Sequence, residues 1–245
     1  MLHDKQQLSL LPSPHYKRLY HLHNPPMFPK ILLAVLLSYL LLPLQAQTKD
    51  ADFTVHHIPD SIFSLMQGRS YPKGCTVPRS SLRYLRVKHV DLHGRERQGE
   101  LVCHQDIATD LIAIFRALYE ARYPIERMEL IDRYGANDDR SMRANNSSAF
   151  NYRHVAGTRV LSNHSYGRAI DINPLYNPYV SGDGRRVQPA NARPYAQRSQ
   201  AFPYKITKGD LCYQLFKQYG FTWGGDWRSK KDYQHFEKAP SKGKY

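Results

Sequence analysis

Cysteine is scarce in this chain, which has only three cysteines among 245 residues. Their spacing does not match that of a metal site built from cysteine, so that kind of site is excluded. Cys75 and Cys103 flank a predicted pair of strands. A disulfide between them stays open, because an exported chain meets oxidising conditions. Cys212 lies on the apolar face of a predicted helix, where we expect a buried free thiol.

Glycine and proline are also limited, at 14 and 16 residues, and no internal repeat is visible. These counts exclude collagen-like and low-complexity chains. Aromatic residues make up 12% of the chain and charged residues 23%, a composition that excludes a disordered protein. The length is sufficient for one well-formed hydrophobic core.

Acidic residues are outnumbered, with 21 Asp and Glu against 35 Lys and Arg, which gives a formal net charge of +14. Residues 1–46 carry +3 of this charge, which leaves +11 on residues 47–245. The excess favours an acidic partner, but charge alone does not choose between nucleic acid, a membrane surface and an acidic substrate. No Arg- or Lys-rich helix and no recognisable nucleic-acid motif accompanies it, so we expect no nucleic-acid partner.

The apolar run Ile31–Leu42 is too short to span a bilayer comfortably. A lysine precedes the run and a small residue follows it, which is the pattern of a secretory signal. We therefore expect residues 1–46 to be a leader that is cleaved, with an uncleaved anchor as the alternative and Met27 as an alternative start. The mature protein, residues 47–245, is then one domain without a stable membrane span. We expect it to be exported to the periplasm or cell envelope.

Hydrophobic periodicity and turn residues predict a mixed, α+β order of elements. Residues 137–153 are polar and predict a long functional loop, and residues 174–204 predict an ordered irregular segment. The motif Thr207-x-x-Asp210 predicts a capping box for a helix that ends at Gly220. The other predicted elements are helices at 61–66 and 105–122, strands at 82–90, 99–103, 128–131 and 170–172, and a last element at 232–237.

Two short segments carry the residues suited to chemistry. A hydrolytic zinc site needs three protein ligands, commonly imidazole and carboxylate, and one position left for water. His164, Asp171 and His235 can supply these ligands. A carboxylate is also needed to take a proton from water, and Asp232, three residues before His235, can reach the same side through a single turn. Each residue alone is a weak signal, because single histidines and aspartates are common on protein surfaces and at strand ends.

Together these segments resemble a known family. Ser-x-His-x-x-Gly-x-Ala-x-Asp-Ile begins at Ser162, and Gly-Gly-Asp-Trp and Asp-x-x-His-Phe follow near the C-terminus. The pattern is similar to that of the zinc D-alanyl-D-alanine carboxypeptidases and L-alanyl-D-glutamate peptidases of bacterial and phage cell-wall metabolism. These proteins share a fold with the vancomycin-resistance dipeptidases and the hedgehog signalling domain. The resemblance covers roughly Asp60 to Phe236 and implies a single small antiparallel sheet flanked by helices.

The resemblance implies one catalytic zinc ion (Zn2+), held by His164, Asp171 and His235. It also implies that Asp232 is the general base, taking a proton from a zinc-activated water and later delivering it to the leaving amine. No residue of the motif is missing, which favours an active enzyme.

Relatives also use an upstream arginine to stabilise the oxyanion or a substrate carboxylate, and both Arg140 and Arg153 fit that description. We favour Arg140 because it precedes a serine, as in relatives, although Asp139 stands where relatives have tyrosine. Arg153 is then a substrate-binding residue. We expect Ser162 to support the loop of the first histidine, and Trp227 to line the cleft or to lie in the core.

The implied function is a secreted, monomeric zinc metallopeptidase that hydrolyses peptide bonds in peptidoglycan stem peptides. D-Ala-D-Ala carboxypeptidase and L-Ala-D-Glu endopeptidase activity both remain open, as does the metal bound in the cell, because such a site accepts other divalent ions. A zinc-bearing wall-binding or signalling module without catalysis is the alternative, as the hedgehog relative illustrates.

Overall fold

The structure is a computed structural model that describes residues 51–240. The predicted leader, with its apolar run and the alternative start at Met27, lies outside the described residues. Within residues 51–240, no helix combines the length and the apolar character needed to cross a membrane.

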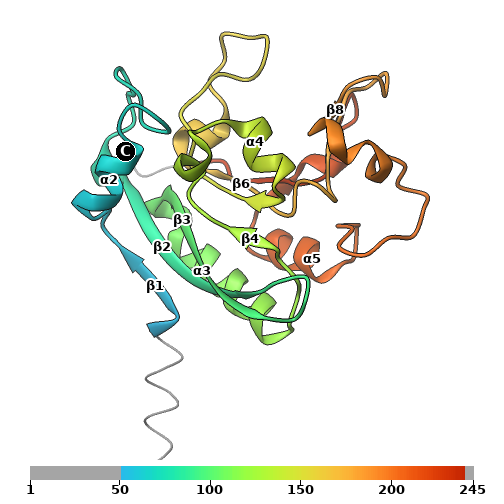
Figure 1. Cartoon of the computed structure of the whole chain (residues 1–245), viewed down its shortest axis with the longest axis horizontal. Coiled ribbons are helices and arrows are strands. Elements are labelled where there is room, and N and C mark those ends of the chain that lie inside the picture. Colours follow the sequence, from blue (N-terminus) through green and yellow to red (C-terminus); the bar gives the residue numbers. More distant parts are fainter. Residues whose placement is uncertain (1–50, 241–245) are drawn as a thin grey trace, which may run out of the picture. The chain divides into compact units, whose positions relative to one another are not determined.

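A long antiparallel hairpin and one helix form the larger core (Figure 1). The hairpin pairs Leu82 with His104 at one end and Val90 with Glu96 at the other. Alternate residues of the hairpin face the helix, whose apolar residues recur every three or four positions and are buried. Full burial of each such side chain contributes about 1.5–3 kcal/mol. The elements are β1 (Phe53–His56), β2 (Leu82–Val90), β3 (Glu96–His104) and α3 (Gln105–Glu120), with β2 in the centre of the sheet.

The opposite face of this sheet carries a second, smaller cluster beside α2 (Asp60–Met66). Cys75 packs against this cluster, whereas Cys103 is buried in the core beneath α3. The sheet therefore separates the two sulfurs, and Cys75 and Cys103 are free rather than bridged. Cys212 is a free, fully buried thiol, as predicted.

The α+β class is confirmed, but the expectation of a single sheet is wrong. Within residues 51–240, three three-stranded antiparallel sheets and one parallel pair are present. Strands after α3 have only two or three residues, so each sheet stays small. The parallel pair is β4 (Arg127–Met128) with β5 (Asn146–Ser147). One of the small antiparallel sheets has the strand order β6 (Ala169–Asp171), β11 (His235–Glu237), β9 (Thr222–Trp223). The other has the strand order β10 (Lys231–Asp232), β7 (Tyr179–Val180), β8 (Val187–Gln188).

A close backbone contact lies where the chain passes from one of these small sheets to the next. Gly224 lies between β9 and β10, and a Cβ atom there would stand 2.5 Å from the carbonyl oxygen of Asp232. Only glycine fits such an approach without moving the backbone. The chain therefore leaves one small sheet and enters the next within a few residues, through η5 (Gly224–Asp226).

The last helix, α5 (Leu211–Gln218), begins one turn later than a cap at Thr207 requires. Asp210 is its N-cap, because Asp210 Oδ1 accepts the backbone N–H of Tyr213 at 2.9 Å. The predicted capping box is therefore wrong, although its aspartate does cap the helix. Gly220, with φ of +80°, ends the segment as predicted.

Other predicted elements differ from the structure where the sequence is polar. The expected loop at 137–153 contains α4 (Asp138–Arg143), whose N-cap Asn137 accepts the N–H of Arg140 at 2.9 Å. This short helix buries little apolar surface and so leaves no apolar period. The strand predicted at 128–131 ends at Met128, and a 3-10 turn follows. The 3-10 helices besides η5 are η1 (Arg79–Ser81), η2 (Ile131–Tyr134), η3 (Asn163–Tyr166) and η4 (Ala190–Ala196).

Candidate metal centre

The 3-10 helix η3 positions His164. Ser162 caps this helix, and its Oγ accepts the backbone N–H of His164 at 3.3 Å, so Ser162 supports the histidine as predicted. Gly167 ends the helix at φ +65°, and a Cβ atom there would lie 2.6 Å from the backbone nitrogen of His104. The helix is therefore fixed between its cap and the end of β3.

Strand pairing positions the other two residues. Asp171 of β6 lies directly opposite His235 of β11 in an antiparallel pair. Directly opposite side chains project from the same face of a sheet. The backbone of Asp171 also forms two hydrogen bonds with Ser148, of 2.9 and 3.1 Å, which hold β6 from its other side.

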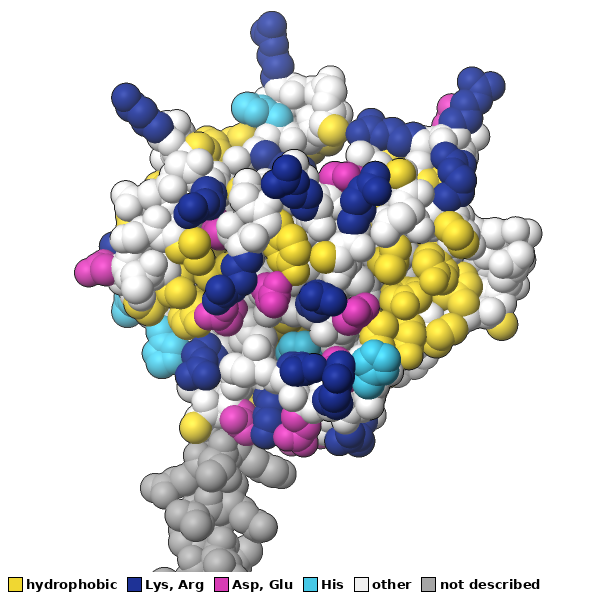
Figure 2. Space-filling model, in the orientation of Figure 1, with side chains coloured by type: hydrophobic (Ala, Val, Ile, Leu, Met, Phe, Trp, Pro, Cys, Tyr) yellow, Lys and Arg dark blue, Asp and Glu magenta, His cyan; other side chains and the backbone are white. Residues whose placement is uncertain are grey.

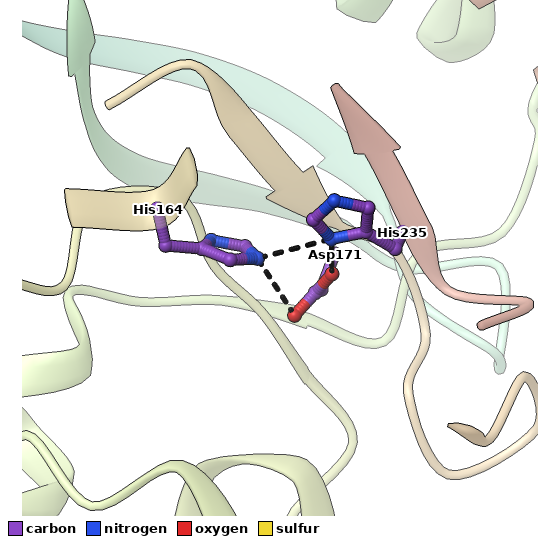
Figure 3. Close-up of side chains that lie close together, drawn as sticks. All are labelled: His164, Asp171 and His235. Carbon is purple, nitrogen blue, oxygen red and sulfur yellow. Dashed lines mark hydrogen bonds and ion pairs between the residues drawn. The ribbon is translucent and has the colours of Figure 1, made fainter. Parts of the chain in front are cut away.

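The three side chains converge on one point (Figure 3). The distance from His164 Nε2 to His235 Nδ1 is 3.2 Å, and from His164 Nε2 to Asp171 Oδ2 it is 3.3 Å. His235 Nδ1 lies 3.1 Å from Asp171 Oδ1. All three residues are buried, and their ligand atoms lie within 4.8 Å of one another.

The outer nitrogen of each imidazole is occupied by an acceptor. His164 Nδ1 lies 2.6 Å from the carbonyl oxygen of Ala149, which can only accept, so Nδ1 carries the proton. His235 Nε2 lies 2.9 Å from Glu237 Oε2 and donates to that carboxylate. The hydrogen bond from His235 lowers the pKa of Glu237, which keeps it ionised. Both inner nitrogens are thereby left with lone pairs that point at the centre.

These residues fit a divalent cation. Two lone-pair nitrogens and a carboxylate in contact repel one another unless positive charge lies between them. The electrostatics agree: burial alone would raise the pKa of Asp171, yet the two neighbouring histidines lower it. Burial alone would lower the pKa of His235, yet the carboxylates of Asp171 and Glu237 raise it. Two imidazoles and a carboxylate form a donor set typical of zinc, with room for a further ligand.

Asp232 lies beside this centre rather than within it. It belongs to β10, and its Oδ1 accepts a hydrogen bond from Gln234 Nε2 at 3.2 Å. Its pKa is raised to about 6, chiefly by burial; the nearby Asp171 also acts to raise the pKa, while His235 acts to lower it. The predicted single helical turn is absent. Instead, the chain passes from β10 to β11 between Asp232 and His235, and both line the same cleft.

A cleft of about 780 Å³ opens above the three residues. Trp227 lines it, half-buried, with its ring centroid 5.4 Å from that of His235. Trp223 is instead the core tryptophan, since it is buried and its Nε1 donates to the carbonyl oxygen of Tyr233. The prediction left both environments open for Trp227, and the structure places it in the cleft.

The structure places Arg153, rather than the favoured Arg140, at the cleft. Arg140 is exposed on α4 and does not line the cleft. Arg153 does line it, and its guanidinium is ion-paired with Asp138. Its backbone N–H donates to Ser165 Oγ at 2.8 Å, which joins Arg153 to the helix that carries His164. Arg140 is exposed to solvent on α4, and the sequence of this polar helix does not indicate which of its faces turns toward the cleft.

Sequence reasoning missed two residues that orient the centre. Asn163 Nδ2 donates to Glu237 Oε2 at 2.6 Å, and the same oxygen accepts from His235. Glu237 stands two residues after His235 in one strand, so both side chains lie on the same face. An acidic residue two positions after a ligand histidine is the signal that could have indicated this contact.

One comparison with known protein families gives a match that includes the candidate site. Residues 156–238 match the family model described as D-alanyl-D-alanine carboxypeptidase. This segment contains His164, Asp171, Asp232 and His235, whereas Arg140 and Arg153 precede it. No solved structure gives a significant match to the chain. Residues 156–238 are therefore similar to the D-alanyl-D-alanine carboxypeptidase family of peptidases.

Proposed function

We propose that this protein is a zinc-dependent peptidase that hydrolyses peptide bonds in the stem peptides of peptidoglycan. The observation that carries the proposal is the convergence of three lone-pair atoms, from His164, Asp171 and His235, beneath an open cleft with Asp232 beside them. A buried centre of this kind without a cleft would suit a structural metal site. The cleft gives a peptide access to it.

When bound, zinc supplies a Lewis acid that polarises a carbonyl oxygen and lowers the pKa of a coordinated water molecule. Asp232 acts as the base, and its oxygen accepts the proton that water loses as it attacks the peptide carbonyl. The same carboxyl group then gives that proton to the departing amine. A base whose pKa is raised to about 6 by burial can perform both transfers near neutral pH.

Arg153 supplies positive charge on the wall of the cleft. Its guanidinium is paired with Asp138 and anchored near His164, so it has a defined position beside the reacting carbonyl. A guanidinium aimed at an oxygen that gains negative charge stabilises the transition state more than the substrate. Trp227 forms an apolar wall next to His235 and limits the access of bulk water.

The charge of the surface suits an anionic polymer. Figure 2 shows Lys and Arg side chains spread over one face, several of them extending from its upper edge. Residues 47–245 carry a net charge of +11, and stem peptides carry free carboxylates. Long-range attraction increases the rate of encounter with such a substrate.

The deciding experiment is digestion of purified muropeptides with and without a zinc chelator, followed by liquid chromatography and mass spectrometry. Hydrolysis that stops with chelator and returns with zinc supports the proposal. Loss of one alanine identifies carboxypeptidase action, and release of a peptide from its L-Ala–D-Glu bond identifies endopeptidase action. Zinc binding without hydrolysis of any muropeptide would instead favour a non-catalytic module, which the presence of Asp232 opposes.

We also propose that the protein acts outside the cytoplasm, in the periplasm or cell envelope. The basis is the apolar run Ile31–Leu42 with its positive flank. Fractionation of expressing cells, with N-terminal sequencing of the mature protein, tests this. A full-length N-terminus in the cytoplasmic fraction would overturn it.

A further inference from the structure

A second cavity, of about 540 Å³, lies beside the turn of the long β2–β3 hairpin, where the hairpin curves past β4 (Figure 1). It shares no lining residue with the cleft above the candidate metal centre. Pockets for small molecules usually measure about 300–1000 Å³, so the cavity has room for one. Met128 is the one apolar residue of its lining, and the others are charged or polar. A ligand of this cavity must therefore be strongly polar.

Asp91 organises the wall that the hairpin contributes. Its side chain is only 5% exposed, and four donors surround it. Asp91 Oδ1 accepts the backbone N–H groups of His93 at 2.8 Å and Arg95 at 3.0 Å. Asp91 Oδ2 accepts the Nε–H groups of Arg95 at 2.8 Å and Arg97 at 3.1 Å. One buried carboxylate thus fixes two guanidinium groups side by side.

The outer ends of these two guanidinium groups are uncommitted. Within residues 51–240, the terminal nitrogens of Arg95 and Arg97 take part in no hydrogen bond or ion pair. The two side chains are 60% and 49% exposed, so a ligand can reach them. Two positive charges also exceed the single negative charge of Asp91. Since a guanidinium binds anionic oxygens through parallel N–H groups, this wall is suited to an anion.

A buried histidine places a different kind of group beside the arginines. His89 lies directly opposite Arg97 in the hairpin, so both side chains project from the same face. His89 Nδ1 lies 2.7 Å from the carbonyl oxygen of Ile125, which can only accept, so Nδ1 carries the proton. Burial lowers the pKa of His89, which keeps the ring neutral. Its Nε2 is left as an acceptor, without a hydrogen-bond partner among residues 51–240.

The wall on the side of β4 also carries acceptors. Glu126 and Glu129 line the cavity, and each accepts one hydrogen bond from a neighbouring polar side chain, at 2.8 and 2.6 Å. Both carboxylates keep further lone pairs that can accept from a ligand. The two walls meet where Met128 packs on Gly99, since a Cβ atom at Gly99 would lie 2.8 Å from Met128 Cβ. The cavity therefore has a cationic side and a side of acceptors.

We propose that this cavity binds an acidic sugar, with its phosphate or carboxylate on Arg95 and Arg97 and a hydroxyl group donating to His89 Nε2. The anionic oxygens accept from the terminal N–H groups of the arginines, while hydroxyl groups donate to His89 and to the glutamates. A bare anion has no donor for these acceptors, and a neutral sugar has no charge for the arginines. No aromatic side chain lines the cavity, so the base of a nucleotide would find no surface on which to stack.

The first test is isothermal titration calorimetry of the wild-type protein with glucose 6-phosphate, glucuronate, glucose and inorganic phosphate at one ionic strength. We expect an acidic sugar to bind about ten- to a hundred-fold more tightly than glucose or inorganic phosphate, as hydrogen bonds to charged groups imply. The tighter of the two acidic sugars identifies the anion as phosphate or carboxylate. Binding of inorganic phosphate or glucose as tightly as the better acidic sugar would overturn the inference, as would binding of neither acidic sugar.

Three variants locate the binding. R97Q removes one guanidinium and should weaken binding of the acidic sugar by about ten- to a hundred-fold. Arg86 is exposed on β2 and does not line the cavity, so R86Q removes the same charge elsewhere on the hairpin and should bind as the wild type does. In H89N, the shorter amide can still donate to Ile125 but leaves no acceptor at the position of Nε2. H89N should weaken binding of the sugar and leave that of inorganic phosphate unchanged.

D91N separates a built site from general attraction between charges. The substitution makes the protein more positive, so net charge alone predicts tighter binding of an anion. We expect weaker binding, because a neutral amide does not hold the two guanidinium groups together. Tighter binding by D91N, or an equal loss in R97Q and R86Q, would contradict the inference, and the second comparison decides if D91N does not fold. Calorimetry requires neither zinc nor hydrolysis, so its result is independent of the proposed peptidase activity.

Discussion

Asp171 and His235 lie directly opposite each other in the β6–β11 pair, with Asp171 Oδ1 and His235 Nδ1 3.1 Å apart. Two of the three candidate ligands are therefore placed by backbone pairing rather than by flexible loops. A site built on paired strands holds its ligand atoms in position before any ion arrives. The site should consequently bind metal with little rearrangement of the backbone.

Metal removal is the first prediction. We expect one zinc ion per chain by elemental analysis, and a lower melting temperature after dialysis against chelator, because an ion that binds only the folded state stabilises it. At a free zinc concentration of 100 times Kd, the stabilisation is about 2.7 kcal/mol. H164A should bind no zinc and should melt at the same temperature with and without chelator. A wild-type melting temperature that changes with neither zinc nor chelator would contradict the assignment of the metal site.

The second prediction concerns the contact between Glu237 and His235. E237Q keeps the size of the side chain but weakens the acceptor that holds the proton on His235 Nε2. Loss of such outer contacts lowers metal affinity by about 10- to 100-fold. Competition with a chromophoric chelator measures the affinity directly. Glu120, exposed at the end of α3, provides the matched control E120Q, for which we expect the wild-type affinity.

The third prediction concerns the base. D232N should retain zinc but lose turnover by about a hundred- to ten-thousand-fold, as expected when a general base is removed. In the wild type, the base must be ionised, so kcat/KM should fall as the pH drops through about 6, where burial places the pKa of Asp232. Zinc bound nearby favours the ionised form of Asp232, so with zinc bound the fall in kcat/KM should occur at a lower pH. A zinc-loaded D232N protein with near-normal turnover would falsify the assignment.

The fourth prediction separates the two arginines. R153Q removes the guanidinium that lines the cleft and should lower kcat by about a hundred- to a thousand-fold, the usual cost of one donor to a developing oxyanion. R140Q changes an exposed residue of α4 outside the cleft and should keep the wild-type rate. Steady-state kinetics on the same muropeptide compares them. The reverse pattern would restore Arg140 as the functional residue.

The fifth prediction tests how η3 is fixed. G167A adds a Cβ atom 2.6 Å from the backbone nitrogen of His104 at a residue with φ of +65°. Strain of this kind costs about 1–3 kcal/mol of unfolding free energy. Gly157 also has a positive φ, of +78°, but no atom lies within 4 Å of its added Cβ, so G157A should cost less. Urea denaturation of both variants measures the difference, and equal costs would show that the contact with His104 is unimportant.

The sequence predicted the structure best where the relevant residues recur at short, regular intervals or form a short motif. The helix at α3 follows from its apolar period, and the convergence of His164, Asp171 and His235 follows from the resemblance of two motifs. The choice between Arg140 and Arg153 depended on the rotation of a polar helix, α4, which no apolar period reveals. The contact between Asn163 and Glu237 joins residues far apart in the chain, so neither segment alone indicates it. Strands of two residues, such as β7 and β8, are too short to leave an alternating pattern.

The division of the cleft between two small sheets has a consequence for how such a protein can diversify. Asp171 and His235 belong to the sheet β6-β11-β9, whereas Tyr179 and Gln188, which also line the cleft, belong to the sheet β10-β7-β8. The hairpin that joins β7 to β8 can therefore change in length or charge without altering the strand pair that carries the two candidate ligands. Replacing residues 181–186 should therefore alter one edge of the cleft while the affinity for zinc stays the same. Substrate choice and metal binding can thus evolve as independent traits on one chain.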